Sequence, residues 1–104
     1  MTYEQLLELC RLYEGATLHT ITGKGFRVGI YVETPFFRPE SSGLGQSDGR
    51  KAVEAFVERF NRTHSLRPKD YADVSRNASY LIGVVLRARE DGRLPALSTL
   101  AVSP

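Results

Sequence analysis

The stretch Ala16-Thr-Leu-His-Thr-Ile-Thr-Gly-Lys-Gly-Phe-Arg-Val-Gly-Ile-Tyr-Val-Glu33 decides the predicted fold. Its first seven residues are rich in β-branched side chains, which favour strands. After the turn Gly23-Lys24-Gly25, apolar residues at 26, 28, 30 and 32 alternate with the solvent-facing positions Arg27, Gly29, Tyr31 and Glu33. A period of two is typical of a strand with one buried face. The stretch therefore predicts a β-hairpin with strands at 16–22 and 26–33.

Two further elements flank this hairpin. A third short strand is expected at 36–38, after a bend at Pro35, and Pro39 ends it because proline cannot serve a central ladder position. Upstream, apolar residues recur at helical spacing over 3–14. Thr2 fits the N-cap of that helix, and Gly15 fits the position just beyond its end.

The second half of the chain predicts helices. An apolar stripe begins after Arg50, and Asp48 is the candidate N-cap of this helix. Pro68 suits the start of a short helical turn through Tyr71. A final helix is expected to begin near Ser75 or Asn77 and to end near Gly92; its apolar centre alone would also fit a buried strand.

These elements define an α+β domain, with a small antiparallel sheet packed against three helices in the order α-β-β-(β)-α-α. One domain is expected over 1–93, followed by an uncharged tail at 94–104. The apolar strand and helix faces should share one core, formed by Phe26, Val28, Ile30, Val32, Val53, Phe56, Val57, Phe60, Leu81 and Val85.

Composition narrows the class of protein. The chain has 104 residues, of which 41% are hydrophobic and 25% charged, as in ordinary globular proteins. We expect a cytoplasmic protein without membrane association, because no apolar run approaches about 18 residues and no secretory pattern opens the chain. The net charge is +2, and residues 38–93 carry eleven basic and eight acidic side chains, a mild basic bias.

The sequence offers little support for a catalytic function. Cys10 lies on the apolar stripe of the first helix, which predicts a buried and inert thiol. His19 and His64 lack metal-ligand spacing, and Asp70 and Asp73 flank Tyr71 on a predicted surface turn rather than forming a converging pair. We therefore expect no metal and no cofactor, and an enzyme is the minority interpretation.

The glycine-rich segment 40–51 allows two interpretations. Ser41, Ser42, Arg50 and Lys51 bring hydroxyls and positive charge to a helix N-terminus, which suits an anion site. The segment is not a Walker A loop, because no Gly-Lys-Ser/Thr follows the required spacing. A plain connector between sheet and helix is the other interpretation.

Basic residues fall at loops and element ends, where they can converge on a phosphate backbone. They are Arg38, Arg50, Lys51, Arg67, Lys69 and Arg76. Four aromatic residues that could stack on bases lie nearby in the sequence, namely Tyr31, Phe36, Phe37 and Tyr71. Because acidic residues are interspersed, a mixed solvated surface is the alternative.

Three segments together resemble small bacterial domains that occur alone or attached to restriction, mobile-element and other DNA-processing proteins. They are Gly15-Ala-Thr-Leu-His-Thr-Ile-Thr-Gly-Lys-Gly-Phe-Arg-Val28, Arg38-Pro-Glu-Ser-Ser-Gly43 and Arg76-Asn-Ala-Ser-Tyr-Leu-Ile82. The resemblance covers most of residues 15–86 and implies nucleic-acid binding. It assigns the loop to Ser41, Ser42, Arg50 and Lys51, and the start of the late helix to Asn77, Ser79 and Tyr80. This chain departs from the pattern by extra loop residues at 44–49.

The leading hypothesis is a non-catalytic nucleic-acid-binding accessory module that contacts the phosphate backbone, with DNA favoured over RNA. Its candidate binding residues are Arg38, Ser41, Ser42, Arg50, Lys51, Arg76, Asn77 and Ser79. The alternative is a protein-interaction or homodimerisation module that uses the sheet face or the tail. An enzyme acting on a phosphate-bearing substrate through the 40–51 loop comes third.

Overall fold

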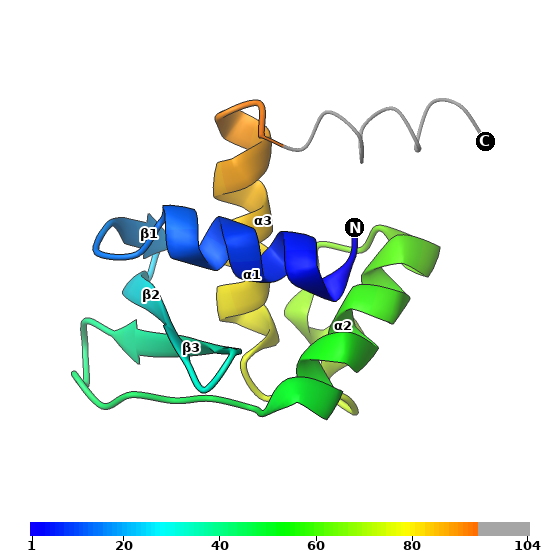
Figure 1. The fold of residues 1–104 in the computed structure, drawn as a ribbon, viewed down its shortest axis with the longest axis horizontal. Coiled ribbons are helices and arrows are strands. Elements are labelled where there is room, and N and C mark those ends of the chain that lie inside the picture. The colour runs from blue at the N-terminus through cyan, green and yellow to red at the C-terminus, as the bar shows by residue number, and fades with distance from the viewer. Residues whose placement is uncertain (94–104) are drawn as a thin grey trace.

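The computed structural model describes residues 1–93, and the predicted tail at 94–104 lies outside the described residues. Along the chain the elements are α1 (Tyr3–Leu12), β1 (Thr17–His19), β2 (Gly25–Tyr31), β3 (Thr34–Pro39), α2 (Arg50–Thr63), the 3-10 turn η1 (Pro68–Tyr71) and α3 (Ala78–Glu90) (Figure 1). A three-stranded antiparallel sheet with three helices confirms the predicted α+β class. None of the described helices is both long and apolar enough to cross a bilayer.

The predicted start of α1 is confirmed by its capping contacts. The Thr2 hydroxyl accepts a hydrogen bond from the Gln5 backbone N–H at 3.1 Å, and the Gln5 side chain accepts one from the Thr2 N–H at 2.8 Å. This reciprocal pair satisfies two donors that the first helical turn leaves free. The helix ends at Leu12, two residues earlier than predicted, and the chain turns through Gly15 (φ +86°) into β1.

The turn between β2 and β3 fixes the register of the sheet. Tyr31 pairs with Thr34, so only Val32 and Glu33 form the turn, and both have positive φ (50° and 59°). Left-handed backbone at both central positions matches the twist of a two-residue hairpin. The expectation that Val32 faces the core is therefore wrong, because the chain reverses there and leaves Val32 77% exposed.

The outer strands also differ from their predicted lengths. β1 is shorter, because the Thr20 N–H donates to the Lys24 carbonyl and closes a turn over residues 20–24. β3 is longer and includes Pro35 and Pro39. The Phe37 N–H points away from β2, toward the Gln46 carbonyl at 2.8 Å, and alternate residues share this direction. The nitrogens of both prolines therefore face the outer edge, where no donor to β2 is needed.

The core lies between the inner face of the sheet and the three helices. The predicted core residues are buried except Val32 and the partly buried Ile30. The Phe26 ring packs against Phe37 (6.1 Å between centroids) and Tyr80 (5.0 Å). A Cβ at Gly83 would lie 2.8 Å from the Phe26 ring, so glycine allows α3 to approach the sheet closely. The opposite face of the sheet carries the exposed side chains of Arg27, Tyr31 and Arg38.

Candidate nucleic-acid interface

The outer face of the sheet is formed by residues at alternate strand positions, which share one side. In the observed register Thr17 pairs with Arg27, which in turn pairs with Arg38. The remaining members are His19, Gly25, Gly29, Tyr31, Thr34 and Phe36. Arg27, Arg38 and Tyr31 are exposed, so this face is available to a ligand in the described structure.

Arg27 and Arg38 lie directly opposite each other on this outer face. Directly opposite residues in an antiparallel ladder have Cβ atoms about 4.5–5.5 Å apart. Within residues 1–93 neither guanidinium forms an ion pair or a side-chain hydrogen bond. The two arginines are therefore neighbours on the outer face, and neither forms an ion pair with an acidic side chain among the described residues.

An aromatic pair lies beside these arginines on the same face. The rings of Tyr31 and Phe36 are 6.1 Å apart, and Tyr31 is 66% exposed. Gly45 lies against the Phe36 ring, since a Cβ at that position would collide with it. The two other aromatics predicted for base stacking, Phe37 and Tyr71, are buried in the core and cannot serve that role in this structure.

Two carboxylates border the arginines. The Glu40 side chain covers Gly25, where a Cβ would collide with it, and a Cβ at Gly29 would lie 3.4 Å from the Glu14 carboxylate. Gly25 and Gly29 are the outer-face neighbours of Arg27 along β2. Because neither carboxylate pairs with Arg27 within 4.0 Å, the two acids limit the extent of the positive region without neutralising its centre.

The 40–49 segment is held against the sheet. Gln46 and Phe37 exchange two backbone hydrogen bonds, of 2.8 and 2.7 Å, along the outer edge of β3. Ser41 and Ser42 lie exposed in the preceding turn, where the Ser42 hydroxyl accepts from the Leu44 N–H. The segment therefore extends the sheet edge, a role that the sequence did not indicate.

Arg76 and Asn77, at the start of α3, lie beside the 40–49 segment, which we call the edge segment. Together with residues 45–47 they line a hollow of about 520 Å³. Since Gln46 pairs with Phe37, the antiparallel register puts Gly45 beside Arg38. Arg38 and Arg76 therefore flank the same short segment, and Arg76 also lacks an ion pair among the described residues.

Asp48 does not cap α2, contrary to expectation. Gly49 occupies the N-cap position, and the Asp48 carboxylate instead accepts from the Ser75 hydroxyl, the Asn77 side-chain amide (2.8 Å) and the Asn77 N–H (3.3 Å). The carboxylate thus lies at the N-terminus of α3, where the helix dipole favours negative charge. Asp48 joins the edge segment to α3.

Arg50 and Lys51, the predicted cations of the loop, lie in the first turn of α2. The Arg50 guanidinium lies 4.6 Å from the centre of the Tyr3 ring, 3.3 Å from Glu54 and 3.8 Å from Glu4. Arg50 thus connects α2 to α1. Lys51 is exposed and makes no ion pair within the described part of the chain.

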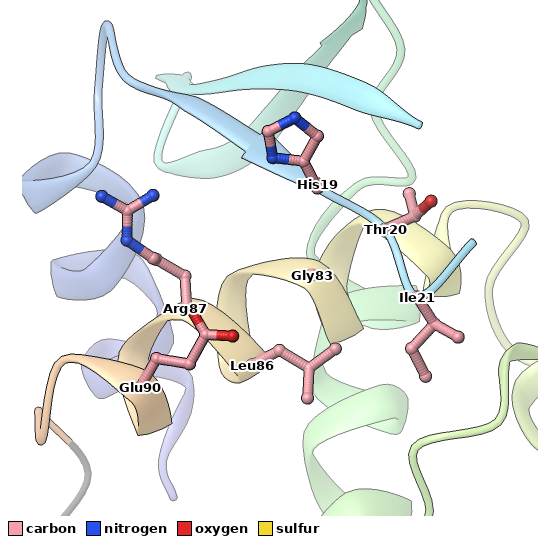
Figure 2. A pocket seen from close by; sticks show the side chains of 7 residues that line it. All are labelled: His19, Thr20, Ile21, Gly83, Leu86, Arg87 and Glu90. Carbon is pink, nitrogen blue, oxygen red and sulfur yellow. The ribbon is translucent and has the colours of Figure 1, made fainter. Parts of the chain in front are cut away.

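Ser79 belongs to a different surface, beside the turn between β1 and β2. That turn borders two hollows against α3, of about 170 Å³ near Ser79 and about 300 Å³ near Leu86. Figure 2 shows the larger hollow, with Arg87 and Glu90 at one end and Ile21 at the other. The predicted site residues therefore divide among several regions of the surface.

The cysteine and the two histidines lie on or beside three different elements, α1, β1 and α2. Cys10 is fully buried, and burial raises the pKa of its thiol to about 12. His19 is exposed on the outer face, and His64 is the C-cap residue of α2. Among the described residues, no three His, Cys, Asp or Glu side chains are grouped closely enough to hold a metal ion.

Comparisons with protein-family models, curated proteins and solved structures found no match for this chain. Its function is therefore inferred from the chemistry of its surface.

Proposed function

We propose that this domain is a non-catalytic nucleic-acid-binding module that contacts the phosphate backbone with the outer face of its sheet. The observation that carries the proposal is the Arg27–Arg38 pair, two exposed arginines opposite each other that form no ion pair within residues 1–93. Like charges directly opposite in a ladder destabilise a sheet. An external anion would relieve that repulsion.

Phosphate suits this pair chemically. Guanidinium groups donate parallel hydrogen bonds that match phosphate oxygens, and they remain charged at any physiological pH. Arg76 lines a hollow together with residues 45–47, and Gly45 lies beside Arg38, so a third cation borders the same segment.

The aromatic pair favours single-stranded nucleic acid as the ligand. Bases of single-stranded nucleic acid stack on exposed aromatic rings, and this binding tolerates many sequences. Tyr31 and Phe36 offer such rings on the same face as the arginines. DNA, which we favour over RNA, is the first ligand to test, and RNA of the same sequence is the comparator.

Fluorescence anisotropy with labelled single-stranded DNA, duplex DNA and RNA at several salt concentrations tests the proposal. The parent should bind single strands, with affinity that falls steeply as salt rises. In Arg27→Ala/Arg38→Ala the salt slope should shrink by about one to two, the expected change for two lost phosphate contacts. The control Arg62→Ala/Arg89→Ala removes the same charge from α2 and α3. A parent that binds no oligonucleotide, or a control that weakens binding equally, overturns the proposal.

A second candidate function is homodimerisation through the β2–β3 turn. Tyr31 and Val32 are adjacent, large and apolar, and 66% and 77% exposed. A contact built on them would bury apolar surface and would not weaken with salt. Sedimentation of the parent and of Val32→Asn at high salt tests this alternative, which requires a dimer that the substitution dissociates.

A further inference from the structure

The smaller hollow beside Ser79 carries chemistry that the proposed function does not use. It lies between the turn at 20–24 and the start of α3, and we call it the turn hollow. Its volume is about 170 Å³, and its lining residues are Thr20, Ile21, Thr22, Lys24, Pro68, Ser79 and Tyr80. Neither Arg27 nor Arg38 contributes to it.

The walls of the turn hollow are apolar. Ile21 is 52% exposed within a tight turn, where glycine, proline and short polar residues normally dominate. Pro68 and Tyr80 line the hollow with it. The Tyr80 ring is fixed from behind, since it packs against Phe26 at 5.0 Å and Phe37 at 5.5 Å. A rigid ring and two aliphatic side chains suit a flat, weakly polar ligand group.

The remaining lining residues are polar, namely Thr20, Thr22, Lys24 and Ser79. The Lys24 N–H donates to the Thr20 hydroxyl at 3.1 Å, and that hydroxyl lies 3.1 Å from the Thr22 hydroxyl, so the turn is ordered before any ligand arrives. Ser79 lines the hollow from the first turn of α3. Lys24 makes no ion pair among the described residues, and no carboxylate lines the hollow.

We infer that the turn hollow binds a nucleotide, with the base between Ile21, Pro68 and Tyr80 and the phosphate at Lys24. Its volume is well below the roughly 300–1,000 Å³ of sites that enclose drug-sized ligands, so only a ring system fits inside. Hydroxyls both donate and accept hydrogen bonds, which matches the mixed edge of a base. The unpaired ammonium supplies the charge that a phosphate outside the hollow requires.

This inference goes beyond the proposed function, because it concerns a surface that the outer-face arginines do not reach. The nucleotide can be free, or it can be one unit of a strand. Titrations of the isotope-labelled full chain, followed by amide NMR shifts, separate these sources. The ligands are deoxyadenosine 5′-monophosphate, deoxyribose 5-phosphate and a deoxyadenosine tetranucleotide.

Saturating amide shifts at Ile21, Gly23 and Ser79 with the mononucleotide support a free nucleotide as the ligand. Shifts that appear only with the tetranucleotide support a nucleotide within a single strand. Lys24→Ala should weaken this binding about tenfold, the effect of one lost charge-assisted contact. Lys69→Ala, next to Pro68 but outside the lining, should leave it unchanged. Equal affinity for the sugar phosphate, or no shift with any ligand, overturns the inference. The Arg27→Ala/Arg38→Ala variant should retain these shifts, so the two sites fail or succeed separately.

Discussion

Arg27 and Arg38 face each other across the β2–β3 ladder on the exposed side of the sheet, and neither has an acidic partner within residues 1–93. The contact contributes nothing favourable to folding, since opposite residues of like charge destabilise a sheet. Arginine at these two positions therefore lowers the stability of the sheet, while it favours the binding of an anionic ligand. Substitutions there can separate a structural role from a binding role.

The substitution Arg38→Glu should stabilise the protein and abolish oligonucleotide binding. It replaces a repulsive cross-strand pair with an attractive one, which should raise the free energy of unfolding by up to about 1 kcal/mol. The same change puts a negative charge where we propose a phosphate to bind. Urea denaturation followed by circular dichroism measures the first effect, and anisotropy measures the second. Parental affinity in this variant would exclude the outer face as the binding surface.

Removing the carboxylate of Glu40 should strengthen binding. Glu40 covers Gly25, beside Arg27, and its charge repels an approaching phosphate. Glu40→Gln keeps the size of the side chain, so affinity for single-stranded DNA should rise severalfold at low salt and return toward the parental value as salt screens the charge. The control Glu58→Gln removes an exposed carboxylate on α2. An equal gain in both variants would indicate only a nonspecific effect of net charge.

A different sequence in the turn at Val32 and Glu33 should stabilise the folded protein. Non-glycine residues in the left-handed region, above all β-branched ones, are strained, and Asn-Gly is favoured in turns of this kind. Val32→Asn/Glu33→Gly should raise the free energy of unfolding by about 1–2 kcal/mol. The Glu33 carbonyl, which accepts from the Tyr3 hydroxyl at 2.8 Å, is retained. A less stable double variant would show that the turn has a different geometry.

Asp48 should be a stability determinant rather than a binding residue. Asp48→Ala leaves the buried Ser75 and Asn77 side chains without their acceptor, and should cost about 2–4 kcal/mol.

Asn77→Asp tests the same contact by repulsion. It puts a second carboxylate against Asp48, and the repulsion raises the pKa of the introduced carboxyl in the folded state. Stability should therefore be retained below the unfolded pKa and lost as pH rises through the raised value. Thermal unfolding at pH 4 and pH 7 checks this sign, and equal losses at both pH values would contradict it.

The Cys10 thiol should be unreactive in the folded protein. Burial raises its pKa to about 12, so almost no thiolate is present at pH 8, and the side chain is inaccessible. Labelling with a thiol-reactive dye should be slow in buffer and should become rapid in denaturant, following the unfolding curve. Rapid stoichiometric labelling without denaturant would show that α1 opens readily.

Much of the architecture was predictable because it depends on local periodicity. The alternation over 26–31 and the apolar stripes of α1 and α2 each specify one buried face, and these faces share one core. The Thr2 cap followed from its own neighbours in the chain. Contacts between distant segments were not predictable in this way. Asp48 was expected to cap the helix that follows it, yet it binds α3, which comes 30 residues later.

The candidate site depends on such long-range relationships. The sequence by itself determined that Arg27 occupies a solvent-facing strand position, that a third strand contains Arg38, and that 40–51 is rich in glycine and polar residues. Only the tertiary structure decided that the two arginines meet. Their pairing follows from the two-residue turn at Val32 and Glu33, which carries no sequence signal for positive φ. Because side chains alternate along a strand, a shift of one residue in that turn would move Arg38 to the buried face.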